Sequence, residues 1–183
     1  MRSNFLALYT VYGQILTWIS GTAGLALFIL AWAVSFNAVS RKVFGAPIAG
    51  TFEVTEALMP LIIMLPMAFT QFRRGHVRVT MLSDRCTRGV ALSLHLVALV
   101  AGCIFMAWVA WATGGFAMRS YSIGESAWGV VRFPIWPTKF AISIGAALLS
   151  FQFLLDIVKI SVFGDDTYRT EEVDMEVEVA RHG

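Results

Sequence analysis

Four long stretches without a single charged residue occupy most of this 183-residue chain. A helix rises about 1.5 Å per residue, so roughly 20 residues cross a hydrocarbon core of about 30 Å. Two of the runs are long enough to cross unaided, whereas the other two have 16 residues each and cross only if flanking residues such as Glu56 and Lys139 lie at the interface. The pattern predicts an all-α integral membrane protein with four transmembrane helices. The uncharged runs are residues 3–40, 57–72, 89–118 and 140–155.

The composition agrees with a chain that folds in lipid. Apolar residues make up 57% of it and charged residues 14%, which is far from the average of soluble domains. Four spans leave no room for a separate soluble domain, and the N-terminus does not resemble a cleaved signal peptide. We expect a membrane domain over residues 1–163 and a disordered, acidic cytoplasmic tail over residues 164–183, since the tail has seven acidic and two basic residues. The expected spans are about 13–39, 52–72, 90–115 and 137–160.

The distribution of basic residues predicts the orientation in the membrane. Arg and Lys in short loops favour the cytoplasmic side. Nine of them fall on the side of the two termini and of the connection 73–88, against five on the opposite side. Both termini are therefore predicted to be cytoplasmic, with a basic cytoplasmic turn between the second and third spans, although Arg41 and Lys42 weigh mildly against this orientation.

Two acidic residues open the second span. Glu53 and Glu56 are three residues apart and so share one helix face. One interpretation is that they complement the helix dipole, worth roughly 0.3–1 kcal/mol. The other is that they mark a polar contact at the outer interface with a helix, a partner protein or an ion. A catalytic pair is the least favoured use, because the sequence offers no third group and no pocket; the chain is not expected to be an enzyme.

The basic turn contains four residues that we assign to topology and lipid contact. Cationic side chains beside a span bind anionic headgroups, each worth about 1 kcal/mol near the surface. Nucleic-acid binding is disfavoured, because no aromatic residues interleave with the arginines. The four residues are Arg73, Arg74, His76 and Arg78.

Other features inside the spans favour a role in helix packing over the binding of an ion, a cofactor or a metal. Pro60 and Pro66 indicate a bend in the second span rather than a broken, ion-binding helix. His95 has no second axial ligand on a facing span, so haem is disfavoured, and no cofactor or metal site is expected. Neither cysteine has metal-ligand spacing. Small residues supply faces where helices can approach closely, at Gly102, Gly114, Gly115 and Gly145.

Three segments of the chain resemble the small membrane subunit, DctQ-like, of TRAP (tripartite ATP-independent periplasmic) transporters. The first is NAVSRKVFGAP, from Asn37 to Pro47. The second is FEVTE, from Phe52 to Glu56, followed after one span by RRGHVRVTML. The third, within residues 122–155, contains Gly124-Glu125-Ser126 and later PIWPTK. The chain departs from the family where Val54 and Thr55 separate the two glutamates and where Ser143 replaces a frequent proline.

The resemblance implies a non-catalytic, four-helix subunit of the bacterial inner membrane. In that family it braces a large membrane subunit, which moves the solute and binds sodium, and it helps to dock a periplasmic solute-binding protein. The solute is typically an organic acid. Membrane lipids are the remaining expected partner, and no nucleic acid is expected. The partner-interface candidates are Arg41, Glu53, Glu56 and Glu125.

Two other classes of function compete with this hypothesis. A self-sufficient small oligomeric channel or exporter needs polar residues facing a pore near mid-membrane, and the uncharged spans offer essentially none. A redox subunit needs paired histidines, which the spans lack.

Overall fold

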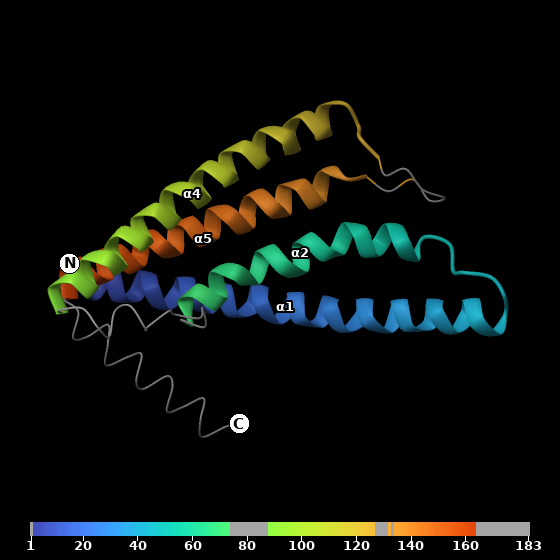
Figure 1. Cartoon of the computed structure of the whole chain (residues 1–183), viewed down its shortest axis with the longest axis horizontal. Helices are drawn as coiled ribbons and strands as arrows, with labels where there is room; N and C mark the ends of the chain where they lie inside the picture. The colour runs from blue at the N-terminus through green and yellow to red at the C-terminus, as the bar shows by residue number, and fades with distance from the viewer. Residues whose placement is uncertain (1, 74–87, 127–131, 133, 164–183) are drawn as a thin grey trace, which may run out of the picture.

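A computed structural model describes residues 2–73, 88–126, 132 and 134–163 (Figure 1). Four long helices make up nearly all of this part, and each is long and apolar enough to cross a membrane. They are α1 (Arg2–Val43), α2 (Thr51–Phe72), α4 (Arg88–Ser122) and α5 (Trp136–Phe163). The described residues contain no strand, only an isolated bridge between Ser126 and Pro134. The predicted all-α architecture with four spans is confirmed. The acidic tail lies outside the described residues.

Two helices extend well beyond the span that the sequence predicts. α1 has 42 residues and begins 11 residues before the expected span of 13–39. α4 continues to Ser122, past the expected end at residue 115. The hydrocarbon thickness requires only about 20 residues, so it sets a minimum length for a helix and no maximum.

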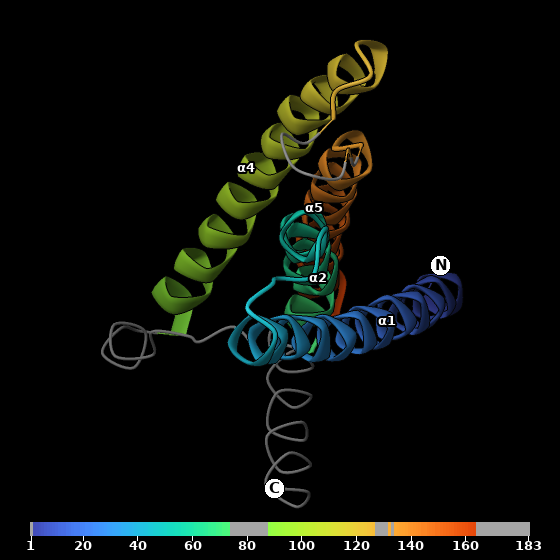
Figure 2. The ribbon, with the colours of Figure 1, turned by 90° about the vertical axis from the view of Figure 1, so that its right-hand side faces the viewer.

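The helices lie in a row, in the order α1, α2, α5, α4. The principal contacts join α1 to α2, α2 to α5, and α5 to α4. Figure 2 shows α1 and α4 on opposite sides of the α2–α5 pair. Both α1 and α4 therefore keep one face that no other described helix covers.

α5 is the central helix of the row. In its most apolar window 44% of the residues are buried, against 6% in α4 and 11% in α1 and α2. The main core joins Leu16 of α1, Ala68 of α2 and Leu149 of α5. A second cluster packs Leu99 of α4 against Ile160 of α5. The core thus follows α5 along its length. α2 and α4 each bury one face against α5, and α1 packs mainly against α2.

Glycine at position 145 allows α2 and α5 to pack at very short range. A Cβ atom there would lie 2.6 Å from the carbonyl oxygen of Met64 and 2.8 Å from its carbonyl carbon. Gly102 and Gly114 also face α5, against Phe153 and Ser143, whereas Gly115 has nothing within 4 Å. The predicted close approach is therefore correct for three of the four glycines and wrong for Gly115. A small residue favours such contact only when its side of the helix faces a neighbour.

α2 runs without interruption through both of its prolines. Pro60 and Pro66 lie inside the helix, so the expectation that they do not break it is confirmed. Gly50, with a φ of 87°, adopts the left-handed conformation immediately before α2 begins. The connection from α1 is fixed by two side chains of the NAVS segment: Asn37 accepts a hydrogen bond from the Ile48 amide at 2.8 Å, and Ser40 donates one to the Ala46 carbonyl at 3.0 Å.

Candidate functional site

The charged side chains of the described residues gather at the two ends of the helix row. We call them the Arg41 end, where α1 ends and α2 begins, and the Arg73 end, where α2 ends and α1 begins. The α4–α5 connection lies at the Arg41 end, since Thr138 of α5 donates a hydrogen bond to the Ala57 carbonyl of α2 at 3.0 Å. Lys159, near the end of α5, lies against Tyr9 of α1 at the Arg73 end.

The structure separates the two glutamates that the sequence places on one helix face. Glu53 lies in the first turn of α2 and is 7% exposed. Glu56, one turn later, is exposed. Arg41 is exposed in the last turn of α1. Of these three interface candidates, Arg41 and Glu56 are surface groups and Glu53 is not, because burial depends on the neighbouring helix as well as on spacing.

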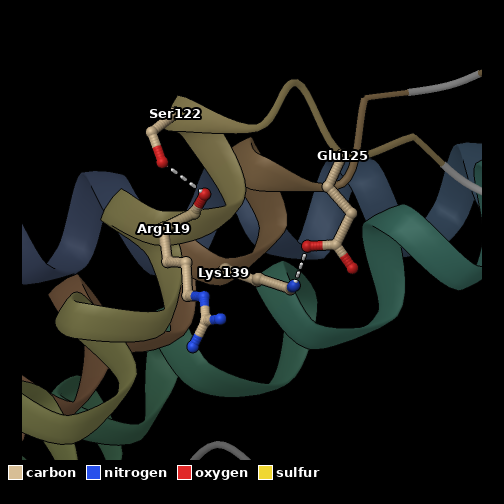
Figure 3. Close-up of polar contacts among 4 residues, drawn as sticks. All are labelled: Arg119, Ser122, Glu125 and Lys139. Carbon is tan, nitrogen blue, oxygen red and sulfur yellow. Dashed lines mark hydrogen bonds and ion pairs between the residues drawn. The ribbon is translucent and has the colours of Figure 1, made fainter.

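Glu125 forms an ion pair with Lys139 at the Arg41 end. Figure 3 shows the two side chains pointing toward each other, from the turn after α4 and from the first turn of α5. The distance from Lys139 Nζ to Glu125 Oε2 is 2.5 Å. The hydrogen bond from Lys139 holds the pKa of the Glu125 carboxyl below its usual value. The pair closes the α4–α5 connection, together with the hydrogen bond from the Ile135 amide to the Glu125 carbonyl at 3.1 Å.

A hydroxyl group near this ion pair satisfies a backbone carbonyl at the end of α4. Ser122 Oγ donates a hydrogen bond to the Arg119 carbonyl at 2.8 Å, within the last turn of α4 (Figure 3). Arg119 and Arg132 are exposed. Trp136 stacks edge to face on Tyr121 at 5.3 Å and on Phe140 at 6.1 Å between ring centroids. This end of the α4–α5 pair is thus a partly basic surface held together by an ion pair and stacked rings.

At the Arg73 end only one of the four topology residues can be described. Arg73 is the C-cap of α2, where its amide donates to the Phe69 carbonyl at 2.8 Å. Its guanidinium carbon lies 5.8 Å from the centroid of the Phe69 ring, and the side chain is exposed. Such a position suits a cation at a membrane surface. Arg74, His76 and Arg78 lie outside the described residues.

A buried polar cluster at the Arg73 end was missed by the sequence analysis. Asp156 of α5 is 1% exposed and accepts hydrogen bonds from Gln71 Nε2 and Gln152 Nε2, both at 2.9 Å. Gln152 is fully buried, and Lys159 is 5% exposed. The cluster thus places polar groups toward the ends of the expected spans 52–72 and 137–160. Asp156 immediately follows the last uncharged run, residues 140–155.

Aromatic residues of α1 close this cluster on one side. The Lys159 ammonium lies 4.5 Å from the centroid of the Tyr9 ring, which is a cation–π geometry. One turn further, the Tyr12 hydroxyl donates a hydrogen bond to the Leu148 carbonyl of α5 at 2.7 Å. The polar groups at the Arg73 end thus join α1, α2 and α5.

The remaining candidates lie between helices or within one. Cys103 of α4 contacts Ser150 of α5, whose hydroxyl donates to the Cys103 carbonyl at 3.0 Å; Cys86 lies outside the described residues. His95 is partly buried within α4. Among the residues that the structure describes, no group of three or more His, Cys, Asp or Glu side chains could hold a metal ion.

Four apolar helices of spanning length, packed through small and hydrogen-bonded residues, define a multi-pass helical membrane protein. A family model of the tripartite ATP-independent periplasmic transporters, DctQ component, matches residues 30–162. The chain therefore belongs to the DctQ family, the small component of TRAP transporters. This is a family of transporter components that work in a tripartite complex with a large membrane partner and a solute-binding partner. No curated protein matches the chain.

Proposed function

We propose that this chain is the non-catalytic small permease subunit that braces the large, sodium-coupled membrane subunit of a TRAP transporter. It also helps to dock a periplasmic solute-binding protein, for uptake of an organic acid-type solute. The observation that carries this proposal is the open row of helices, with α5 buried at its centre and apolar faces of α1 and α4 that no other described residues cover.

The uncovered faces are rich in large apolar side chains. On α1, Phe28, Trp32 and Phe36 recur every four residues and stack on one another, with ring centroids 6.2 and 5.6 Å apart. On α4, Trp108 and Trp111 are largely exposed. Lipid or an apolar membrane protein can cover such faces, and a large membrane partner of the kind that the family has fits this surface.

The polar groups of the spans favour a supporting role over a transport path. Gln152 and Asp156 are at most 1% exposed, and the hydroxyls of Ser143 and Ser150 donate to carbonyl groups of α4. Polar residues that line a solute path must be able to leave their partners and meet the solute. We therefore place the coupling sodium ions in the large subunit, and we assign no cofactor to this chain.

The location that fits this role is the bacterial inner membrane, with both termini cytoplasmic. The Arg41 end then faces the periplasm, where a solute-binding protein can reach Arg41, Glu56 and the surface around the Glu125–Lys139 pair. The Arg73 end faces the cytoplasm and its anionic lipid headgroups.

Reconstitution tests the bracing role. Proteoliposomes would contain the large subunit alone, this chain alone, or both, with binding protein and labelled solute outside and a sodium gradient. We expect uptake only when both membrane subunits are present. Uptake by this chain alone would contradict the proposal, as would full uptake by the large subunit without it.

A second experiment separates docking from folding. Arg41→Ala and Glu56→Gln remove exposed charges, so we expect the complex of membrane subunits to form normally while uptake needs a higher concentration of binding protein. Glu53→Gln, which alters a buried group of the same helix turn, is the comparison and is expected to lower the yield of the folded chain. If uptake by both surface variants depends on the concentration of binding protein as it does for the unchanged complex, the docking role is wrong.

A further inference from the structure

Helix α1 has two opposite faces, and the described part of the chain uses only one of them for packing. Leu16, Ala23 and Leu30 recur every seven residues on the inner face, where each is at most 7% exposed. Two residues correspond to a rotation of about 200° on an α-helix, so the positions two residues further along point away from this packing. We call them, with their exposed neighbours, the outer face of α1. Its members are Trp18, Gly21, Gly24, Leu25, Phe28, Trp32, Ser35, Phe36 and Val39, all of them exposed.

The outer face combines large side chains with open space. Gly21 and Gly24 have nothing within 4 Å of the place where a Cβ atom would be. They lie in sequence between Trp18 and Phe28, whose side chains are 77% and 61% exposed. Gly13 of the same helix, by contrast, lies against α2. Glycine is less favourable than alanine inside a helix, so the two open glycines lower stability without serving a contact that the described residues show.

The aromatic rings of the outer face are already held in place. Trp32 stacks on Phe28 and on Phe36, with ring centroids 6.2 and 5.6 Å apart, so little side-chain freedom is lost when another molecule covers them. Together with Trp18, these rings expose about 500 Å² of apolar surface, and the aliphatic side chains of the face add to it. A stable interface of standard size buries about 800 Å² on each partner. The face is therefore large enough to hold a protein.

We propose that the outer face of α1 is the contact surface for a transmembrane helix of the large membrane subunit. This inference rests on the proposed bracing function and names the face through which the chain braces. The face extends from Trp18 to Val39, about 33 Å along the helix axis, which matches a hydrocarbon core of about 30 Å. Seven-residue spacing suits two helices that cross at about 20°. The partner helix places a bulky apolar side chain beside Gly21 and small residues opposite the rings.

A second copy of this chain fits the outer face less well. Two copies with the same orientation in the membrane pair their α1 helices in parallel, which sets Trp18 against Trp18 and Gly21 against Gly21. Large side chains then meet large ones, and open space meets open space. Lys42, exposed one turn after Val39, also meets its own copy, and like charges repel. A helix of different sequence avoids both conflicts.

The test is copurification of the large subunit with a tagged form of this chain, from membranes in which both are expressed. Gly21→Leu and Gly24→Leu fill the open space, and we expect each to lower the amount of copurified large subunit at least fivefold. Gly115→Leu on α4 is the matched control, because Gly115 also has nothing within 4 Å; we expect it to leave copurification unchanged. Thermal unfolding of each chain alone in detergent is expected to show no loss of Tm, since leucine favours a helix over glycine.

Photo-crosslinking locates the contact without filling the open space. Benzoylphenylalanine replaces Phe28 on α1 or, as the control, Phe116 on α4, which are 61% and 65% exposed. After irradiation of the membranes, we expect a product that joins this chain to the large subunit from position 28, and at least fivefold less of it from position 116. If a leucine variant lowers the Tm, the crosslinks decide.

The outcomes separate this inference from the proposed function. Weaker copurification with G115L than with G21L and G24L, or equal or stronger crosslinking from position 116, overturns the assignment to α1 and leaves the bracing role in place. Full copurification with all three variants overturns it in favour of lipid, and a crosslinked pair of copies of this chain overturns it in favour of a second copy. If the large subunit does not copurify with the unchanged chain, the bracing role itself is wrong.

Discussion

At the scale of single residues, the packing of this protein depends on positions where one atom group decides whether two helices can touch. Gly145 is the tightest of these, because the backbone of Met64 occupies the space where a side chain would start. Backbone cannot swing aside as a flexible side chain does, so any larger residue must push α2 away from α5.

Gly145→Ala is therefore expected to destabilise the chain by about 1–3 kcal/mol. Gly115→Ala is the matched control, since a methyl group there meets nothing within 4 Å and alanine favours helix by up to about 1 kcal/mol. Thermal unfolding in detergent compares the two. Equal stability of the two variants would show that the α2–α5 contact is looser than the structure indicates.

The Glu125–Lys139 pair gives a prediction about pH. Because Lys139 holds the pKa of Glu125 below its ordinary value of 4.5, the pair favours the folded connection above that pH, and the contribution disappears as the pH falls through the lowered pKa. In Lys139→Met the pKa of Glu125 should rise toward the ordinary value. A carboxyl carbon NMR titration of labelled Glu125 measures it. Arg132→Met, in the same connection, serves as the control and should leave the midpoint in place.

The residue-scale features differ in how far the sequence predicts them. The glutamates at positions 53 and 56 and the glycines were visible as types and spacings. Their burial was not, because it depends on which neighbour each helix face meets. The polar cluster was harder still, since Gln71 and Asp156 are 85 positions apart in the sequence and only the packing of α2 on α5 brings them together.

At the scale of elements, α5 holds α2 and α4 through side chains that donate to backbone carbonyls. Thr138 reaches α2, while Ser143 and Ser150 reach α4 at Ala110 and Cys103. Such bonds satisfy a hydroxyl in an environment without water and place it opposite one particular turn of its neighbour. They explain how helices with so few charges can still adopt one arrangement.

Ser143→Ala removes the 2.7 Å bond to the Ala110 carbonyl and is expected to cost about 0.6 kcal/mol, up to about 1.7 kcal/mol. Ser35→Ala is the comparison, because the Ser35 hydroxyl bonds to Ala31 within its own exposed turn of α1. Chemical or thermal unfolding in detergent should separate the two variants. A larger effect at Ser35 than at Ser143 would contradict the central role of α5.

The number of helices and their approximate positions along the chain could be predicted from the uncharged runs, because the hydrophobic thickness of the membrane sets the minimum length of each helix. The helix ends could not. Nothing in the sequence of α1 stops the helix at the membrane boundary, and Asn37 and Ser40 lie inside it, where they fix the following connection. Likewise, the central place of α5 does not follow from its composition, which resembles that of the other spans.

At the scale of the whole molecule, the row of helices presents two broad apolar flanks and two polar ends. Its orientation in the membrane decides which end a solute-binding protein can reach. Nine basic residues on one side against five on the other predict that the Arg41 end faces the periplasm.

Cysteine labelling checks the orientation. In a background with Cys86→Ser and Cys103→Ser, the variants R41C and R73C place a thiol at either end of the row. An impermeant maleimide added to intact spheroplasts is expected to label R41C and to reach R73C only after permeabilisation. The reverse pattern would place both termini in the periplasm and would move the docking surface to the Arg73 end.

The 42 residues of α1 extend for about 63 Å, roughly twice the thickness of the bilayer interior. A rod of this length must either lean steeply or project into the surrounding water. If it leans, the subunit occupies a much wider footprint among the lipids than a four-helix protein of its mass otherwise would. A partner protein bound to this subunit would then have to displace a larger area of lipid in order to move sideways in the membrane.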